Sequence, residues 1–275
     1  MGGFKGRPTG TFSPGSYNLS STAWQGGKKI ILHVNTNVGG VKSDTGTDLN
    51  KVALRTGGWP TGTSLQIDIG SSGRLQGAGG NGRQGTTNSG QPAQAFAGTS
   101  ALGVEYPAQI NNNGIIRCGY GGGGGGSGAA NDPSDKSDTD YGRTGGGGGG
   151  GAGLPAGNGG LGGSGGFNGD PPYQGNPGDP GNLNAGGQGG ITYPEGGANA
   201  GPGGDGGDFN DAPTSGTKGT QDRPGVGYDP PGNSGGAGSD GKAIYYSSSS
   251  VQSASSFSGN TVGGRNGGTQ TGFFN

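Results

Sequence analysis

The run Gly145-Gly-Gly-Gly-Gly-Gly-Gly151-Ala-Gly153 decides the fold of this chain. Seven consecutive glycines offer no side chain for burial, and an ordered glycine loses more backbone entropy than any other residue. The run is the densest part of a long glycine-rich region, because 47 of the 78 glycines lie between residues 121 and 242. An ordered structure there must therefore be held together by its main chain.

Glycine density divides the 275 residues into three regions. Residues 1–118 contain both tryptophans, Trp24 and Trp59, and are expected to form a β-rich region. Residues 119–242 are expected to form the glycine-based domain. Residues 243–275 contain few glycines and are expected to form a strand-like tail that includes Ala243-Ile-Tyr-Tyr246 and Phe273-Phe274.

Composition and charge exclude several protein classes. Only 24% of the residues are hydrophobic, so any side-chain core must be small and local. The 16 basic and 17 acidic residues nearly cancel, which disfavours charge-driven disorder and gives no basic patch for nucleic acid or an anionic membrane. The longest aliphatic run is Ile30-Ile-Leu32, so neither a signal peptide nor a membrane span is expected.

Short strands with a loose repeat are expected in the first region. Apolar and polar residues alternate over 29–35, 51–55, 64–69 and 113–118, and no stretch has the 3.6-residue period of an α-helix. The stretch beginning Gln66-Ile-Asp-Ile is echoed about 42 positions later by the stretch beginning Gln109-Ile-Asn-Asn, and each continues through a turn into glycine. This repeat predicts coils of a small β-solenoid that leads into the glycine region.

The middle region alternates glycine tracts with four richer inserts. The inserts span 129–144, 167–184, 191–195 and 208–231. They carry nearly all the aromatic residues of this region, namely Tyr141, Phe167, Tyr173, Tyr193, Phe209 and Tyr228. A flexible linker would not sort its aromatic residues in this way, and Gly-X-Y never persists as collagen requires.

The interpretation that fits best is a sandwich of packed polyglycine II helices, each extended and with three residues per turn. Such a helix makes no internal hydrogen bonds, so every N–H and C=O group must find a partner on a neighbouring helix. Neighbours approach closely enough only where no Cβ intervenes, so the X residues of Gly-Gly-X should lie on outer faces. The fold expected is all-β or irregular with almost no α-helix, a rigid scaffold whose connecting loops can vary and bind.

These residues resemble a known family, the glycine-rich distal tail-fibre adhesins of T-even-like bacteriophages. The matching elements occur in the same order over about residues 63–265: Gly77-Ala-Gly-Gly-Asn-Gly82, Ile110-Asn-Asn-Asn-Gly-Ile-Ile-Arg117, the run 121–126, split glycine tracts, and Gly241-Lys-Ala-Ile244. The resemblance implies a virion protein at the tip of a trimeric tail fibre, with residues 1–118 as the region that attaches it to the fibre end. It also implies loops that bind a surface receptor, commonly an outer-membrane protein, and places them in the four inserts. Residues 1–60 match the family's attachment module poorly.

The six insert aromatics are therefore the candidate receptor-binding residues, although any one of them could instead cap the glycine bundle. No catalytic, metal or cofactor site is expected. The only histidine, His33, lies on an expected strand, where a packed or edge-strand role is favoured over catalysis. The acidic stretch 132–142 contains Asp-x-Asp-x-Gly but has Arg143 and Gly149 where a calcium-binding EF-hand loop needs glycine and glutamate.

Two other functions remain as alternatives. An ice-binding protein can also use glycine-rich helices, but it presents a flat face of small residues and has no need of aromatic inserts. A polysaccharide-degrading fibre tip would need a pair of carboxylates, which an Asp pair among the 17 acidic residues could supply.

Overall fold

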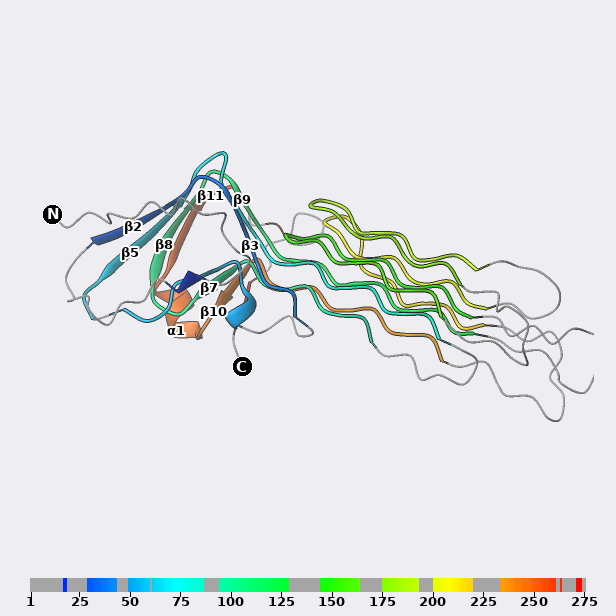
Figure 1. Cartoon of the computed structure of the whole chain (residues 1–275). Coiled ribbons are helices and arrows are strands. Elements are labelled where there is room, and N and C mark those ends of the chain that lie inside the picture. Colours follow the sequence, from blue (N-terminus) through cyan, green and yellow to red (C-terminus); the bar gives the residue numbers. More distant parts are fainter. Residues whose placement is uncertain are drawn as a thin grey trace, which may run out of the picture.

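The fold is taken from a computed structural model of the chain. The structure describes residues 17–18, 29–43, 49–59, 61–86, 94–128, 144–163, 175–192, 200–219, 233–260, 263 and 271–273. These residues form two parts, a three-sided β-solenoid at one end and a bundle of long extended segments that leaves it (Figure 1).

Every pair of strands in the described part of the solenoid is parallel. The strands make sheets of five, four and three members in the orders β1-β4-β7-β10-β12, β11-β8-β5-β2 and β3-β6-β9. Their bounds are β1 Tyr17–Asn18, β2 Lys29–Val34, β3 Asn37–Gly39, β4 Leu54–Arg55, β5 Ser64–Ile69, β6 Arg74–Gln76, β7 Leu102–Val104, β8 Ala108–Asn112, β9 Ile115–Arg117, β10 Ile244–Tyr246, β11 Ser256–Gly259 and β12 Thr271–Phe273. Each of the first three turns of the solenoid thus adds one strand to each side, and the tail strands β10, β11 and β12 add to two of the three sheets.

The register of the coils is the one that the sequence repeat predicts. Gln66 on β5 pairs with Gln109 on β8, and Ile67 pairs with Ile110. The tail closes the solenoid, since β10 adds to β7 and β11 adds to β8. Within the tail, β10 also pairs with β12, which places Tyr246 opposite Phe273.

Aliphatic side chains from successive coils stack to fill the solenoid. Ile67, Ile69 and Ile110 are fully buried, and they pack with the other members of one cluster. A fully buried aliphatic side chain contributes ~1.5–3 kcal/mol relative to an exposed one, so this column is the main side-chain contribution to stability. The small local core expected from composition is therefore the solenoid interior.

One sequence expectation changes in detail. The expected strand over 51–55 is a 3₁₀ turn, Leu49–Lys51, followed by the short β4. The only α-helix of the described residues, α1 Ser249–Ser253, is five residues long, so the expectation of almost no α-helix is confirmed. His33 lies on β2 at the sheet edge, with its Nδ1 3.4 Å from a carboxylate oxygen of Asp68, as an edge-strand histidine.

The bundle is inserted into the solenoid at two points. The chain leaves after β6 and returns at β7, and it leaves again after β9 and returns at β10. We call the ten extended segments of the described residues the glycine rods, and together the glycine body. They span 77–86, 94–101, 119–128, 144–153, 157–163, 175–182, 186–192, 200–207, 213–219 and 233–241. The body therefore also takes in two rods that precede residue 119.

Rod 144–153 shows how the rods associate. The N–H groups of residues 145–151 donate hydrogen bonds of 2.7–3.1 Å to other rods. In order, the acceptors are the carbonyls of Thr86, Gly201, Asn176, Arg83, Gly204, Asp179 and Gly80. Every third acceptor belongs to the same neighbour, so the rod repeats every three residues, as a helix with three residues per turn requires.

The carbonyl groups of the same rod reach three further neighbours. Those of residues 145–151 accept, in order, from the N–H groups of Gly163, Gly126, Gly190, Gly160, Gly123, Gly187 and Gly157. Rod 144–153 is therefore surrounded by six rods, and its backbone is hydrogen-bonded to all of them. Rod 119–128 is bonded to six rods in the same way, and the other eight rods form the perimeter.

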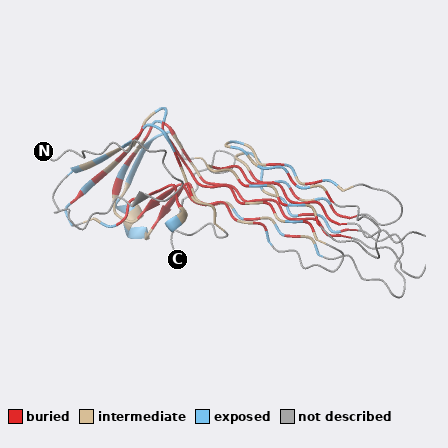
Figure 2. Cartoon of the chain, in the orientation of Figure 1, coloured by how far each residue is buried: buried red, intermediate tan, exposed pale blue. Residues whose placement is uncertain are grey.

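Glycine is required because the rods touch through their backbones. A Cβ added to any glycine of residues 145–151 would lie within 3.0 Å of a neighbouring carbonyl oxygen. The X residues of Gly-Gly-X point outward instead, and the exposed examples are Asn158, Leu161, Gln188, Ile191, Pro202 and Asp205. Figure 2 shows this division, with buried residues along the inner rods and exposed positions along the outer ones.

Candidate functional site

The glycine body has two unlike ends. At its proximal end the rods meet the solenoid and are joined by short turns at residues 154–156, 183–185 and 208–212. At its distal end the rods finish far from the solenoid (Figure 1). The five sequence segments that connect them there, 87–93, 129–143, 164–174, 193–199 and 220–232, lie outside the described residues.

Hydroxyl side chains finish the rods at the distal end. Thr144 Oγ1 donates to the carbonyl of Gly163 at 2.7 Å and accepts from the N–H of Gly175 at 2.8 Å. Ser127 Oγ accepts from the N–H of Gly219, and Thr192 Oγ1 donates to the carbonyl of Ala200. These hydroxyls satisfy backbone groups where the rod lattice ends, so four of the five connecting segments, all but 87–93, start or end at a fixed anchor.

Five of the six predicted receptor-binding residues belong to these connecting segments. Tyr141, Phe167, Tyr173, Tyr193 and Tyr228 lie outside the described residues, and their predicted role stays a prediction. What the structure gives is the position of the residues that flank them, all at the distal end of the body.

Phe209, the sixth, lies at the proximal end instead. Its ring is half-buried, with the guanidinium carbon of Arg117 4.5 Å from the ring centroid. It also packs against the cluster of Cys118, Tyr120 and Ala152. Phe209 therefore covers the junction between solenoid and body, the capping role that the sequence left open for each aromatic.

A tight turn at Asp208 explains why Phe209 lies at the proximal end and not in a distal insert. Asp208 Oδ1 accepts from the N–H groups of Asn210 and Asp211, which turns the chain back at once into rod 213–219. The stretch 208–231, expected to be one insert, is thus a proximal turn, a rod and a distal segment. The expected insert 167–184 likewise includes rod 175–182.

Burial at the junction shifts the pKa values of its titratable groups. Burial raises the pKa of the Cys118 thiol to about 12, and burial also raises the pKa of Tyr120. Burial, together with the positive charge of Arg117, lowers the pKa of Arg74. A thiol held neutral in this way is a poor nucleophile, so Cys118 is a packing residue.

The described residues include no group of three or more His, Cys, Asp or Glu side chains placed to hold a metal ion. None of their helices is long and apolar enough to cross a membrane.

Comparison with known proteins gives one family and one solved structure. The model of the family described as phage tail fibre adhesin Gp38 matches residues 11–272. The solved structure is the gp37-gp38 adhesin tip complex of the long tail fiber of bacteriophage S16. It is 20% identical, and the match covers 91% of this chain and 68% of that chain with a TM-score of 0.38. No curated protein matches.

Proposed function

The chain belongs to the phage tail fibre adhesin Gp38 family, and from this premise we propose that it recognises the host by binding a protein of the bacterial outer membrane. As a family member it is a bacteriophage tail fibre adhesin, a virion component at the distal end of the fibre. The receptor and the residues that contact it are the proposal.

One observation carries the proposal. All five connecting segments join the rods at the end of the body that lies away from the solenoid (Figure 1). A lattice of backbone hydrogen bonds tolerates little change, whereas the segments between its fixed ends can differ freely in length and sequence. Tyr141, Phe167, Tyr173, Tyr193 and Tyr228 then supply aromatic contacts of the kind that dominate protein interfaces. Phe209 is left out because it packs at the junction.

The solenoid is the part that we propose mounts on the distal end of a trimeric fibre. It lies at the opposite end of the molecule from the distal ends of the rods, so attachment there leaves those rod ends facing outward. Residues 1–118 were expected in this role from sequence, and the solenoid takes β1 to β9 from them but not rods 77–86 and 94–101. It also includes the tail strands β10, β11 and β12, which add to the same sheets.

We propose adhesion without catalysis, and the family is an adhesin family rather than an enzyme family. The outer positions of the rods also weigh against ice binding. They mix Leu161, Gln188, Ile191 and Asp205, which is not a regular face of small residues.

The test is binding of the full chain to host cells that lack individual outer-membrane proteins. Loss of binding to one deletion strain, restored by the cloned gene, is expected, and undiminished binding to every strain contradicts a protein receptor. Alanine substitution of each of the five distal aromatics should weaken binding at least about tenfold for one or more. Phe257→Ala on β11, an aromatic residue 39% exposed, is the matched control and should bind normally.

A further inference from the structure

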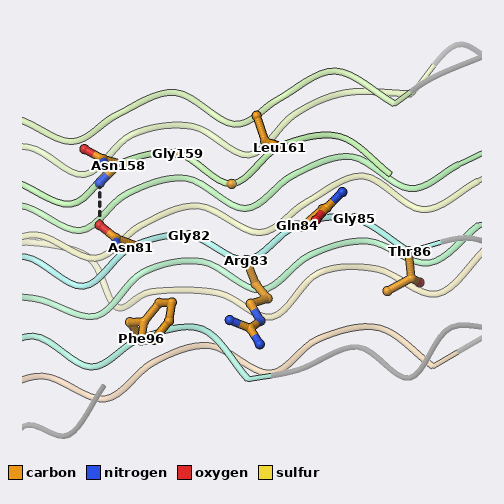
Figure 3. Close-up of a pocket in the computed structure, with 11 residues that line it drawn as sticks. Asn81, Gly82, Arg83, Gln84, Gly85, Thr86, Phe96, Asn158, Gly159 and Leu161 are labelled. Atoms are coloured by element: carbon orange, nitrogen blue, oxygen red, sulfur yellow. Dashed lines mark hydrogen bonds between the residues drawn. The ribbon is translucent and has the colours of Figure 1, made fainter. Parts of the chain in front are cut away.

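A groove runs along the side of the glycine body, away from the junction, and reaches Thr86 at the distal end of its rod. We call it the lateral groove, and it has a volume of about 540 Å³. Rods 77–86 and 157–163 form its length and Phe96 closes one side. Figure 3 shows Leu161 on one side and Arg83 with Phe96 on the other. Its size is that of a small-molecule site.

The backbone of rod 77–86 offers hydrogen-bond donors to this groove. The N–H groups of Gly80, Gly82, Arg83 and Gly85 all donate to carbonyls of neighbouring rods. Those of Asn81 and Gln84 donate to no backbone carbonyl of the described residues. Asn81 and Gln84 are three residues apart, which is one turn of the rod, so their N–H groups point outward in the same direction. At ~3.1 Å per residue, these two N–H groups are about 9 Å apart.

The side chains at one end of the groove are held in place. Lys42 Nζ donates to Oδ1 of Asn81 at 3.1 Å and to Oδ1 of Asn158 at 3.0 Å. The N–H of Asn158 also donates to Asn81 Oδ1 at 2.9 Å. With both oxygens occupied, the two amide NH₂ groups are fixed in direction and remain as donors.

The charged side chains at the groove are positive. Arg83 lines it, with its guanidinium carbon 5.3 Å from the centroid of the Phe96 ring, and Lys42 lies at the asparagine end. None of the eleven lining residues is Asp or Glu. An arginine held flat over a ring presents a fork of donors to one phosphate or carboxylate.

We propose that the lateral groove binds an anionic saccharide, one that carries phosphate or carboxylate groups. Amide side chains and outward N–H groups suit the closely spaced hydroxyls of a sugar, while Leu161 and Phe96 offer apolar surface to its C–H faces. Leu161 is 67% exposed and thus available for contact. Arg83 supplies the charged contact. The groove runs along the side of the rods up to Thr86, and none of the five distal aromatic residues is among its described lining residues. Binding there would give the adhesin a second contact, with saccharides of the host surface.

The experiment is isothermal titration calorimetry of the full chain with a phosphorylated core oligosaccharide released from bacterial lipopolysaccharide by mild acid. The same oligosaccharide after enzymatic dephosphorylation is the second probe. Arg83→Ala should weaken binding of the phosphorylated probe about tenfold and Gln84→Ala about threefold to tenfold. Arg83→Ala should change binding of the dephosphorylated probe much less, because the guanidinium then has no anion to contact.

Matched controls lie on other faces of the body. Lys218→Ala removes the same charge as Arg83→Ala, and Gln188→Ala removes the same amide as Gln84→Ala, both at exposed positions. Neither control should alter binding. The proposal is overturned if the native chain binds neither probe, or if Arg83→Ala and Gln84→Ala bind as the controls do. Gln84 is exposed, so its variant keeps the test valid even if Arg83→Ala melts early.

Discussion

The carbonyl oxygen of Gly123 lies within 3.0 Å of the place that a Cβ atom would take on Gly148. The two glycines belong to the two central rods, and Gly123 also donates its N–H to the carbonyl of Gly149 at 2.8 Å. A methyl group on Gly148 would push the two rods apart and lengthen the hydrogen bonds between them. The body therefore depends on the absence of side chains in the same way that a core depends on their presence.

Gly148→Ala should destabilise the chain by about 3 kcal/mol or more, because the clash is with backbone on a rod that has neighbours on all sides. We expect a melting temperature lower by at least about 6 °C. Gly236→Ala is the matched control, since its Cβ would meet only the Cγ of Gln94, at 3.8 Å. Equal melting temperatures for the two variants would contradict the backbone lattice.

Thr144→Val should cost about 1–3 kcal/mol of unfolding free energy. The change keeps the shape of the side chain but leaves the N–H of Gly175 and the carbonyl of Gly163 without the hydroxyl that bonds both. Thr144 is 3% exposed, so water cannot replace it without rearrangement. Urea unfolding measures the difference, and Thr144→Ser, which keeps the hydroxyl, should lose much less.

Stability should fall as the pH rises above about 9. The pKa of Cys118 is about 12 in the folded chain against an ordinary value of 9.0, because burial disfavours the thiolate. Between these pH values the folded state binds more protons than the unfolded state. The stabilisation that comes from the buried, neutral Cys118 thiol is therefore complete below pH 9 and is lost toward pH 12. Burial also raises the pKa of Tyr120, which adds a loss of the same sign at higher pH.

Urea unfolding at pH 8, 9 and 10 tests this linkage. Cys118→Ala removes one titrating group and should make the decline shallower, by up to ~1.4 kcal/mol per pH unit where the thiol titrates only in the unfolded chain. Ser250→Ala, an exposed change on α1, should leave the decline unaltered. A decline as steep in Cys118→Ala as in the native chain would show that another group causes it.

The sequence predicted the central rods and the solenoid register because both leave local signals. A run such as 145–151 has no use other than close backbone contact, and Gln66 and Gln109 begin matching strands that pair. The outward phase of Leu161 and Gln188 also followed from Gly-Gly-X.

The sequence pattern did not predict rod 175–182, because this rod lies on the perimeter of the body. Only Gly175, Gly178 and Gly181 face the carbonyls of rod 144–153, so the positions between them are free to be Asn, Pro or Asp. A perimeter rod therefore reads as a mixed insert. Rod 94–101 was hidden for the same reason, with Gly98 as its only glycine. The proximal place of Phe209 depended on how these rods turn, which no local pattern records.

The period of three can be tested without a change in composition. In rod 186–192, Gln188 and Ile191 share the outward phase, whereas a Cβ on Gly189 would lie within 3.0 Å of the carbonyl oxygen of Gly203. The double variant Gln188→Ile with Ile191→Gln exchanges two outward side chains. It should stay within about 0.5 kcal/mol of the native chain, as surface changes do.

The double variant Gln188→Gly with Gly189→Gln moves the same glutamine by one position and so turns it toward the neighbouring rod. Its side chain then meets backbone that cannot yield, and we expect a loss of about 3 kcal/mol or more. Both variants keep the native amino-acid composition, so hydropathy and glycine content are constant between them. If both unfold at the same urea concentration, position along the rod does not matter, and three residues per turn is the wrong period for this lattice.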